Sequence, residues 1–376
     1  MEINFESLKI NEKIISGLNT MGIKEPTEIQ KEIILPAINK ENLIGQSETG
    51  TGKTLAYLLP IIENIDTSKK EIQCIILAPT HELAIQINNT INEVKKSANL
   101  EITSTPLIGS ANIKRQIDNL KAKPHIIVGS AGRIFELMGK KKVTAHTIKT
   151  IVIDEVDKLL DKNNLPVIKN IIKSTQNQTQ LMMFSATLNN KTLEIAKDLA
   201  KDIKVISVKN NKVNENIKHS YIKTDYRKKI ETLRKLLNSI KGEKVLVFNN
   251  DSYTTNTTIE YLSFNNVKVD AIGGSGKMED RKRALENFRK GKIQVLIASD
   301  IAARGLDIKE VNYVINFDIP EDPNDYLHRA GRVGRAGKSG EVFSLVNERE
   351  ENLIEIYEKN FKIDISERTL YKGNIE

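Results

Sequence analysis

Short apolar runs alternate with amphipathic stretches along almost the whole chain. Most of these runs are apolar at nearly every position, as is typical of parallel strands that are covered on both faces. The runs lie at residues 72–78, 102–108, 125–129, 150–155, 180–186, 219–224, 244–249, 267–272, 293–299, 311–317 and 341–346. Helical patterns separate them, for example at residues 82–96, 228–240 and 279–290. The alternation predicts an α/β fold with doubly wound, mainly parallel sheets.

The pattern also predicts two domains joined by a short linker. Complete strand–helix series lie on both sides of residues 208–218, a polar stretch rich in Asn and Lys that has no apolar periodicity. We predict domains at residues 1–207 and 218–376, with a linker at 208–217; a long surface loop is the alternative. Residues 344–363 predict a closing amphipathic helix followed by a short tail.

Charge adds a candidate partner to this picture. The 376 residues carry a net charge of +8, and the basic excess is shared by both halves of the chain. A polyanion such as a nucleic acid would therefore contact both domains rather than a basic tail. A single cysteine, Cys74, and a start without the pattern of a signal peptide lead us to expect a cytoplasmic protein.

Residues 47–54, SETGTGKT, follow a short apolar run and precede a helical pattern. Glycines such as Gly50 and Gly52 let successive backbone N–H groups point at phosphate oxygens, and a following helix adds its positive dipole end. Lys53 would reach the β- and γ-phosphates, while the Thr54 hydroxyl would bind Mg²⁺. The stretch predicts a nucleotide site; the alternative is a Gly/Thr-rich turn before a helix with no ligand.

Two acidic residues, Asp154 and Glu155, end another apolar run. That position is the carboxyl edge of a parallel sheet, where ligand sites form in α/β folds. Asp154 could hold Mg²⁺, and Glu155 could orient and deprotonate the attacking water. In isolation the pair would suggest only a helix N-terminus, but a phosphate loop in the same chain favours the catalytic interpretation.

Residues 328–337, HRAGRVGRAG, place Arg329, Arg332 and Arg335 three positions apart among glycines. Arginines so spaced can present planar donors to a phosphate and stabilise charge in a transition state. A solvated basic helix end is the alternative. With the two preceding stretches, these arginines complete a candidate catalytic set: Lys53, Asp154, Glu155, Arg332 and Arg335.

These stretches, in this order, resemble the DEAD-box ATP-dependent RNA helicases of superfamily 2, from Phe5 to about Gly337. The resemblance implies two tandem RecA-like domains, with ATP and Mg²⁺ as cofactors. It matches Gln30 to the glutamine that reads adenine and residues 154–157, DEVD, to the family motif. The implied metal ligands are Thr54 and Asp154. The implied nucleotide contacts are Ile23, Gln30, Ser47, Glu48, Thr49, Gly50, Thr51, Gly52, Lys53, Thr54, Gly305 and Asp307.

The same resemblance implies RNA contacts through the sugar-phosphate backbone at Thr80, His81, Gly109, Arg133, Arg281, Ser299 and Arg304. It implies coupling between ATP and RNA through Ser185, Thr187, His328 and Arg329. We therefore expect RNA-dependent ATP hydrolysis and local unwinding of RNA duplexes with little sequence preference. Departures from the family motifs, such as His81 in place of arginine, leave open an ATP-gated RNA clamp that unwinds weakly. A superfamily 2 DNA helicase is a further alternative.

Overall fold

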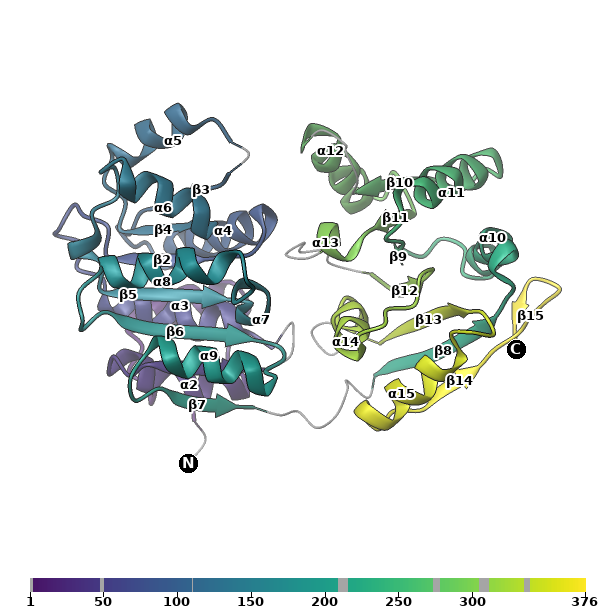
Figure 1. The fold of residues 1–376 in the computed structure, drawn as a ribbon, viewed down its shortest axis with the longest axis horizontal. Helices are drawn as coiled ribbons and strands as arrows, with labels where there is room; N and C mark the ends of the chain where they lie inside the picture. Colours follow the sequence, from purple (N-terminus) through teal and green to yellow (C-terminus); the bar gives the residue numbers. More distant parts are fainter. Residues whose placement is uncertain are drawn as a thin grey trace. The chain divides into compact units, whose positions relative to one another are not determined.

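The computed structural model describes residues 3–47, 51–109, 111–208, 216–272, 278–303, 311–334 and 339–376. The chain forms two compact units, residues 1–209 (unit 1) and 210–376 (unit 2) (Figure 1). Most of the linker expected at residues 208–217 lies outside the described residues, so its boundaries stay a prediction.

Unit 1 contains one parallel sheet with the strand order β3-β4-β2-β5-β6-β1-β7. The arrowheads of β5, β6 and β7 point the same way in Figure 1. Most of the strand residues are fully buried because helices cover both faces of the sheet. The strands are β1 (Leu43–Gln46), β2 (Cys74–Leu77), β3 (Ser104–Leu107), β4 (Ile126–Gly129), β5 (Thr150–Asp154), β6 (Gln180–Ser185) and β7 (Lys204–Ser207).

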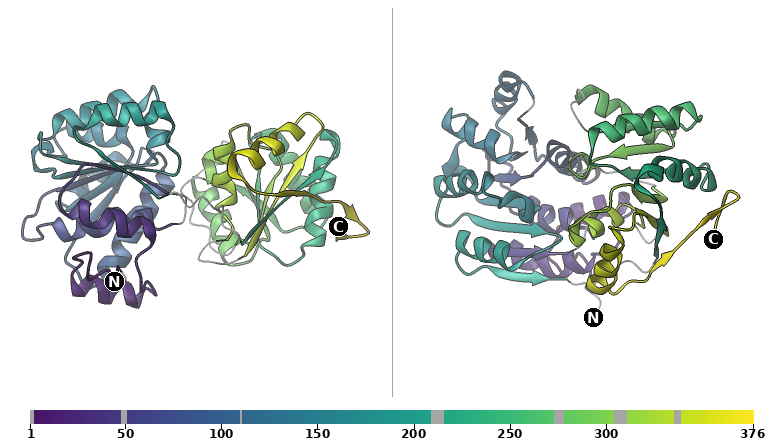
Figure 2. Two further views of the ribbon diagram at one scale, coloured as in Figure 1. Left: turned by 90° about the horizontal axis from the view of Figure 1, so that it is seen from below. Right: turned by 45° about the vertical axis from the view of Figure 1, so that its right-hand side comes forward.

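Two apolar cores, one on each face of this sheet, hold unit 1 together. The first core packs α1–α4 against the sheet, and the second packs α5–α9 against the other face (Figure 2). The helices are α1 (Glu12–Thr20), α2 (Glu28–Ile38), α3 (Lys53–Asn64), α4 (His81–Ser97), α5 (Ile113–Leu120), α6 (Ala131–Gly139), α7 (Val156–Leu159), α8 (Asn164–Ser174) and α9 (Asn190–Leu199).

Unit 2 repeats this design with a second parallel sheet in the order β10-β11-β9-β12-β13-β8-β14. Its strands are β8 (Ile217–Lys223), β9 (Val245–Phe248), β10 (Val269–Ile272), β11 (Val295–Ala298), β12 (Tyr313–Asn316), β13 (Gly340–Val346) and β14 (Ile365–Glu367). Its helices are α10 (Lys229–Ser239), α11 (Ser252–Phe264), α12 (Met278–Arg289), α13 (Asp300–Ala303), α14 (Pro323–Ala330) and α15 (Glu351–Phe361).

The predicted fold class is confirmed, because both large sheets are parallel and covered by helices. The C-terminal segment differs from the expected short tail. After α15 it adds β14 to the edge of the sheet beside β8, and then forms an antiparallel pair of β15 (Leu370–Tyr371) and β16 (Asn374–Ile375). Strands of two or three residues are too short to produce a readable hydrophobic period.

No helix in the described parts of the chain combines the length and the apolar character that crossing a bilayer requires.

Candidate functional site

The candidate residues of unit 1 gather at one edge of its sheet. All seven strands run in parallel, so their carboxyl ends meet at that edge. The register aligns the ends of neighbouring strands, pairing Gln46 with Ser185, Phe184 with Asp154, and Leu77 with Gly129. The residues that follow these strands include Ser47, Thr80, Gly109, Arg133 and Glu155.

The described part of the phosphate loop is held by internal hydrogen bonds. The Ser47 and Thr51 hydroxyls lie 2.6 Å apart, and Lys53 Nζ donates to the Ser47 carbonyl. Gly52 precedes α3 with φ 93°, a left-handed conformation that strains any residue with a side chain. The turn at Gly52 therefore places the first backbone N–H groups of α3 and the side chain of Lys53 at the same end of the helix. Glu48, Thr49 and Gly50 lie outside the described residues.

Gln30, the candidate adenine reader, is also tied to the phosphate loop. Its side chain is buried, and Nε2 donates to the Gly52 carbonyl at 3.1 Å. Its Oε1 accepts from Thr27 N–H at 3.1 Å. The bond to Gly52 uses one of the two Nε2 hydrogens and leaves a donor for a nucleobase. Ile23 is partly buried and packs against the first core.

Asp154 lies buried at the end of β5, where two donors fix its carboxylate. The Tyr57 hydroxyl donates to Oδ2 at 2.9 Å, and Glu155 N–H donates to Oδ1 at 2.9 Å. Burial, followed by the charge of Glu155, raises the pKa of Asp154 to about 6, whereas Lys53 and these hydrogen bonds lower it. Tyr57 was not foreseen as a site residue, because its partner lies 97 positions further along the chain.

Glu155 has a left-handed backbone, with φ 52° and ψ 55°. This conformation is uncommon outside glycine and costs about 1–3 kcal/mol where the surrounding structure imposes it. Such strain recurs at functional sites, where it fixes the direction of a side chain. The backbone at Glu155 is therefore held in a specific conformation directly beside the buried Asp154.

The predicted coupling residues Ser185 and Thr187 both contact Asp157. Ser185 Oγ donates to Asp157 Oδ1 at 2.6 Å, and Thr187 Oγ1 donates to Oδ2 at 3.3 Å. Asp157, the last residue of DEVD, was absent from the candidate list, although its place in that motif was a usable signal. These bonds join the end of β6 to α7, directly beside Glu155.

In unit 1, Arg133, a predicted RNA contact, has a role that the sequence did not predict. Its Nη2 donates to the Gly109 carbonyl at 2.6 Å and its Nη1 to the Ala111 carbonyl at 3.2 Å, while Nε lies 3.2 Å from Glu136. Arg133 thus supports the loop that carries Gly109. Thr80 caps α4 by accepting from Leu83 N–H at 3.1 Å, and His81 is the first residue of α4.

In unit 2, the predicted coupling residue Arg329 is buried and contacts several elements. Its guanidinium binds both carboxylate oxygens of Asp300, at 2.7 and 2.6 Å, and donates to Asn316 Oδ1 at 3.0 Å. It also lies 4.8 Å from the centre of the Phe248 ring. Burial raises the pKa of Asp300, but the hydrogen bonds and charge of Arg329 outweigh it and hold that pKa below its ordinary value.

The other described candidates of unit 2 occupy separate elements. Ser299 follows β11, and its hydroxyl accepts from Ala302 N–H at 3.2 Å. Arg332 is buried just after α14, His328 lies 3.8 Å from Asp325 on that helix, and Arg281 belongs to α12. The remaining candidates lie outside the described residues: Arg304, Gly305, Asp307 and Arg335.

Comparison with known proteins identifies relatives across nearly the whole chain. Residues 27–196 match the DEAD/DEAH box helicase family, and residues 228–337 match the helicase conserved C-terminal domain. The chain is 40% identical to the probable ATP-dependent RNA helicase YfmL of Bacillus subtilis over 95% of this chain and 94% of that protein. It is 38% identical to the DEAD-box ATP-dependent RNA helicase CshC of Bacillus cereus, over 94% and 90% of the two chains.

Among solved structures, the chain is similar to S. cerevisiae Dbp5 bound to RNA and ADP BeF3, with a TM-score of 0.88 and 28% identity. That likeness covers 97% of this chain and 95% of Dbp5. A DEAD box protein from Methanococcus jannaschii is 32% identical, with a TM-score of 0.57 over 97% and 98% of the two chains.

Proposed function

Because the chain belongs to the DEAD-box family of ATP-dependent RNA helicases, we propose that it uses ATP hydrolysis to open short RNA duplexes with little sequence preference. The reaction is ATP + H₂O → ADP + phosphate, stimulated by RNA. The observation that carries this proposal is that Lys53, Asp154 and Glu155 lie together at the carboxyl edge of the parallel sheet of unit 1. We place the activity in the cytoplasm, where both ATP and RNA are available.

In this proposal unit 1 holds the nucleotide. Lys53 and the amino end of α3 neutralise the phosphates, and the remaining Nε2 hydrogen of Gln30 bonds to the adenine edge. Since Gln30 also bonds to Gly52, base recognition and phosphate-loop geometry share one side chain. Ile23, Gly305 and Asp307 complete the proposed nucleotide contacts.

The residues present also fit a Mg²⁺ ion. Mg²⁺ prefers oxygen ligands and is usually held by one or two carboxylates together with substrate phosphates. Asp154 supplies a buried carboxylate whose ionised form a cation would stabilise, and Thr54 supplies a hydroxyl in the first turn of α3. When bound, the ion would neutralise charge on the β- and γ-phosphate oxygens.

Glu155 is proposed as the group that orients the attacking water and accepts its proton. The strained backbone at Glu155 supports this role because it limits the directions that the carboxylate can take. Arg332 and Arg335 are proposed to stabilise the charge that develops on the transferred phosphoryl group. Asp157 would link this chemistry to Ser185 and Thr187.

RNA is proposed to bind through its sugar-phosphate backbone, which gives little sequence preference and a marked dependence on salt. The proposed contacts are Thr80, His81, Gly109, Arg133, Arg281, Ser299 and Arg304. Contacts to the 2′-hydroxyl would distinguish RNA from DNA. Because three atoms of Arg133 are occupied by protein partners, this residue would act mainly by positioning Gly109.

A Glu155→Gln variant tests the catalytic assignment. Glutamine preserves the shape of the side chain but cannot accept the proton, so ATP and RNA should still bind while RNA-stimulated phosphate release falls by at least 10². Normal turnover would remove Glu155 from the proposed role. Single-stranded DNA serves as the control ligand, because equal stimulation by DNA would contradict RNA selectivity.

An ATP-gated RNA clamp is the second candidate function. The histidine at position 81, where the family motif has an arginine, and the occupied guanidinium of Arg133 favour it, because neither position offers RNA a free guanidinium. Phosphate release and duplex separation measured side by side distinguish the two functions. ATP hydrolysis without strand separation would support the clamp.

A further inference from the structure

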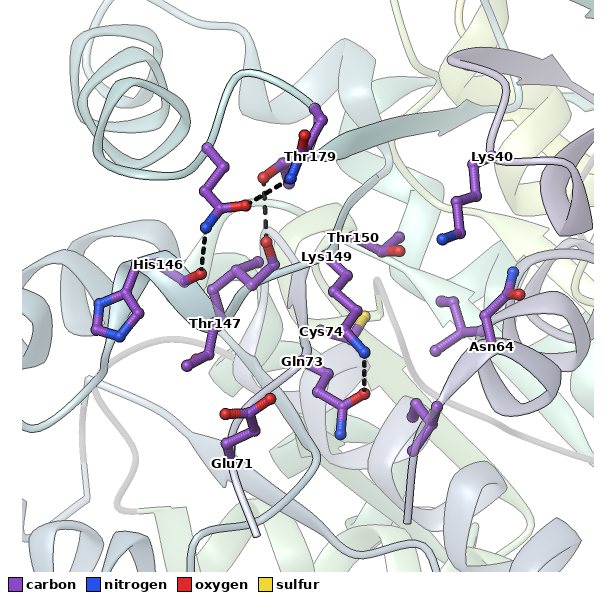
Figure 3. Close-up of a pocket in the computed structure, with 15 residues that line it drawn as sticks. Lys40, Asn64, Glu71, Gln73, Cys74, His146, Thr147, Lys149, Thr150 and Thr179 are labelled. Carbon is purple, nitrogen blue, oxygen red and sulfur yellow. Dashed lines mark hydrogen bonds between the residues drawn. The ribbon is translucent and has the colours of Figure 1, made fainter. Parts of the chain in front are cut away.

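Unit 1 contains a cavity of about 620 Å³ at the amino ends of its strands (Figure 3). Cys74 and Thr150, which begin β2 and β5, line it, and so does Thr179, directly before β6. The candidate ATP-binding residues lie at the carboxyl ends of the same strands. The cavity is therefore a different place from the site described above, and its volume suits a small molecule.

Two lysines, Lys40 and Lys149, line this cavity. Lys149 Nζ donates to Gln73 Oε1 at 3.1 Å, a neutral partner. In the part of the chain that the structure describes, neither Lys149 nor Lys40 forms an ion pair. An ammonium beside a polar cavity favours an anionic ligand, and lysine is a common phosphate-binding residue.

Glu71 places one carboxylate on the opposite side of the cavity from Lys40 (Figure 3). An ionised carboxylate only accepts hydrogen bonds, so its suitable partners are hydroxyl or amino groups. The two sides of the cavity therefore favour a ligand with an anionic end and a donor-rich end.

The polar lining is held in place before any ligand binds. Gln73 Nε2 donates to the Asp66 carbonyl at 2.8 Å, and Gln176 Nε2 donates to the His146 carbonyl at 3.0 Å. Gln178 Nε2 in turn donates to Gln176 Oε1 at 2.8 Å. Because these side chains are already ordered, a ligand would lose less free energy to immobilising them.

We propose that this cavity binds a small sugar phosphate, with its phosphate between Lys40 and Lys149 and its hydroxyl groups toward Glu71. This binding site is additional to the ATP and RNA sites of the proposed function.

Calorimetric titration of ribose 5-phosphate and of inorganic phosphate into the full chain tests the proposal. The chain is first saturated with ADP and Mg²⁺, so that the phosphate loop is occupied. Both probes should bind saturably at one site. Lys40→Gln and Lys149→Gln should each weaken both probes about tenfold, because each removes one charge-assisted hydrogen bond.

Glu71→Gln separates the sugar end from the phosphate end. It should weaken ribose 5-phosphate several-fold and leave inorganic phosphate bound as tightly or more tightly, because a nearby negative charge is lost. Lys142→Gln is the matched control, since Lys142 is exposed in unit 1 outside the cavity. The proposal is overturned if neither probe binds saturably, or if the control loses as much affinity as the cavity variants.

Discussion

At the scale of single residues, the environment of Asp154 favours function over stability. A carboxylate buried next to Glu155 is costly to ionise, and the pKa of Asp154 is raised to about 6 for that reason. A bound cation would offset this cost. Without a cation, the ionised Asp154 destabilises the folded chain at neutral pH. Functional sites often destabilise the fold that carries them in this way.

Asp154→Asn should therefore stabilise the unliganded chain. The folded-state pKa of Asp154 is higher than its unfolded value, so its unfavourable effect is present above pH 6 and disappears below about pH 4. We expect a gain of about 2 kcal/mol in the free energy of unfolding at pH 7.5 and almost none at pH 4. Urea unfolding without nucleotide or Mg²⁺ measures both values. Asp364→Asn, an exposed site, should show neither effect.

Tyr57→Phe should raise the Mg²⁺ concentration needed for ATP hydrolysis. The substitution removes the hydroxyl that donates to Asp154 Oδ2, but it keeps the ring that packs 5.0 Å from Phe184. Loss of one such bond costs about 1 kcal/mol, or roughly fivefold in affinity. Activity measured against Mg²⁺ concentration tests this, with Tyr226→Phe as an exposed control. If the Mg²⁺ requirement is unchanged, the hydrogen bond from the Tyr57 hydroxyl to Asp154 does not contribute to Mg²⁺ binding.

Individual side-chain contacts were the least predictable part of the site. Motif order led to Lys53, Asp154 and Glu155 because each stands at a fixed position at or after the end of a strand. The partners of Tyr57 and Arg133 come from distant stretches of the chain, and local pattern carries no information about such contacts. The sequence did not predict that Arg329 is buried, for the same reason: its guanidinium on α14 bonds to Asp300 on a different helix, α13.

At the scale of elements, Arg329 joins four parts of unit 2. It lies on α14, bonds to Asp300 on α13 and to Asn316 on β12, and stacks on Phe248 of β9. Asn250, just after β9, also donates to Asp300 at 2.7 Å. A rigid, planar, permanently charged group suits this position because it satisfies several acceptors at once.

Arg329→Ala should destabilise unit 2 by about 3–5 kcal/mol, because it removes a buried guanidinium and leaves the partly buried Asp300 carboxylate without its ion-pair partner. Arg329→Lys should recover part of this loss but not the paired hydrogen bonds. Scanning calorimetry of the full chain measures both variants. Arg349→Ala, at an exposed arginine of the same unit, should leave the unfolding temperature unchanged. If it lowers that temperature as much as Arg329→Ala does, the contacts of Arg329 do not account for the loss of stability.

Long elements could be predicted closely from the sequence, and short edge strands could not. The expected helix at 82–96 corresponds to α4 (His81–Ser97), and the one at 228–240 corresponds to α10 (Lys229–Ser239). Both show several turns of amphipathic pattern. By contrast, β7 is largely exposed, and β14 has only three residues, so neither produces a continuous apolar run.

At the scale of the whole molecule, the proposed catalytic groups are divided between the two units. Lys53, Asp154 and Glu155 belong to unit 1, and Arg332 and Arg335 belong to unit 2. Each unit has its own sheet and its own apolar cores. Unit 1 therefore holds most of the proposed nucleotide contacts, whereas Gly305, Asp307 and the proposed arginines belong to unit 2.

Residues 1–209 expressed alone should fold and bind ATP but hydrolyse it slowly. Loss of an arginine that stabilises the transition state reduces turnover by about 10³-fold or more. Phosphate release with saturating RNA, compared with that of the full chain, tests this prediction. Turnover within tenfold of the full chain would show that the arginines of unit 2 are not required.

The strand order of both sheets has a consequence for how the chain folds as it is synthesised. In unit 1 the first strand, β1, lies between β6 and β7, and in unit 2 the first strand, β8, lies between β13 and β14. The first strand of each unit cannot pair with its neighbours until the last strands of that unit have left the ribosome. Until then its backbone groups are unpaired and open to aggregation, so slow translation through either unit would prolong its most vulnerable period.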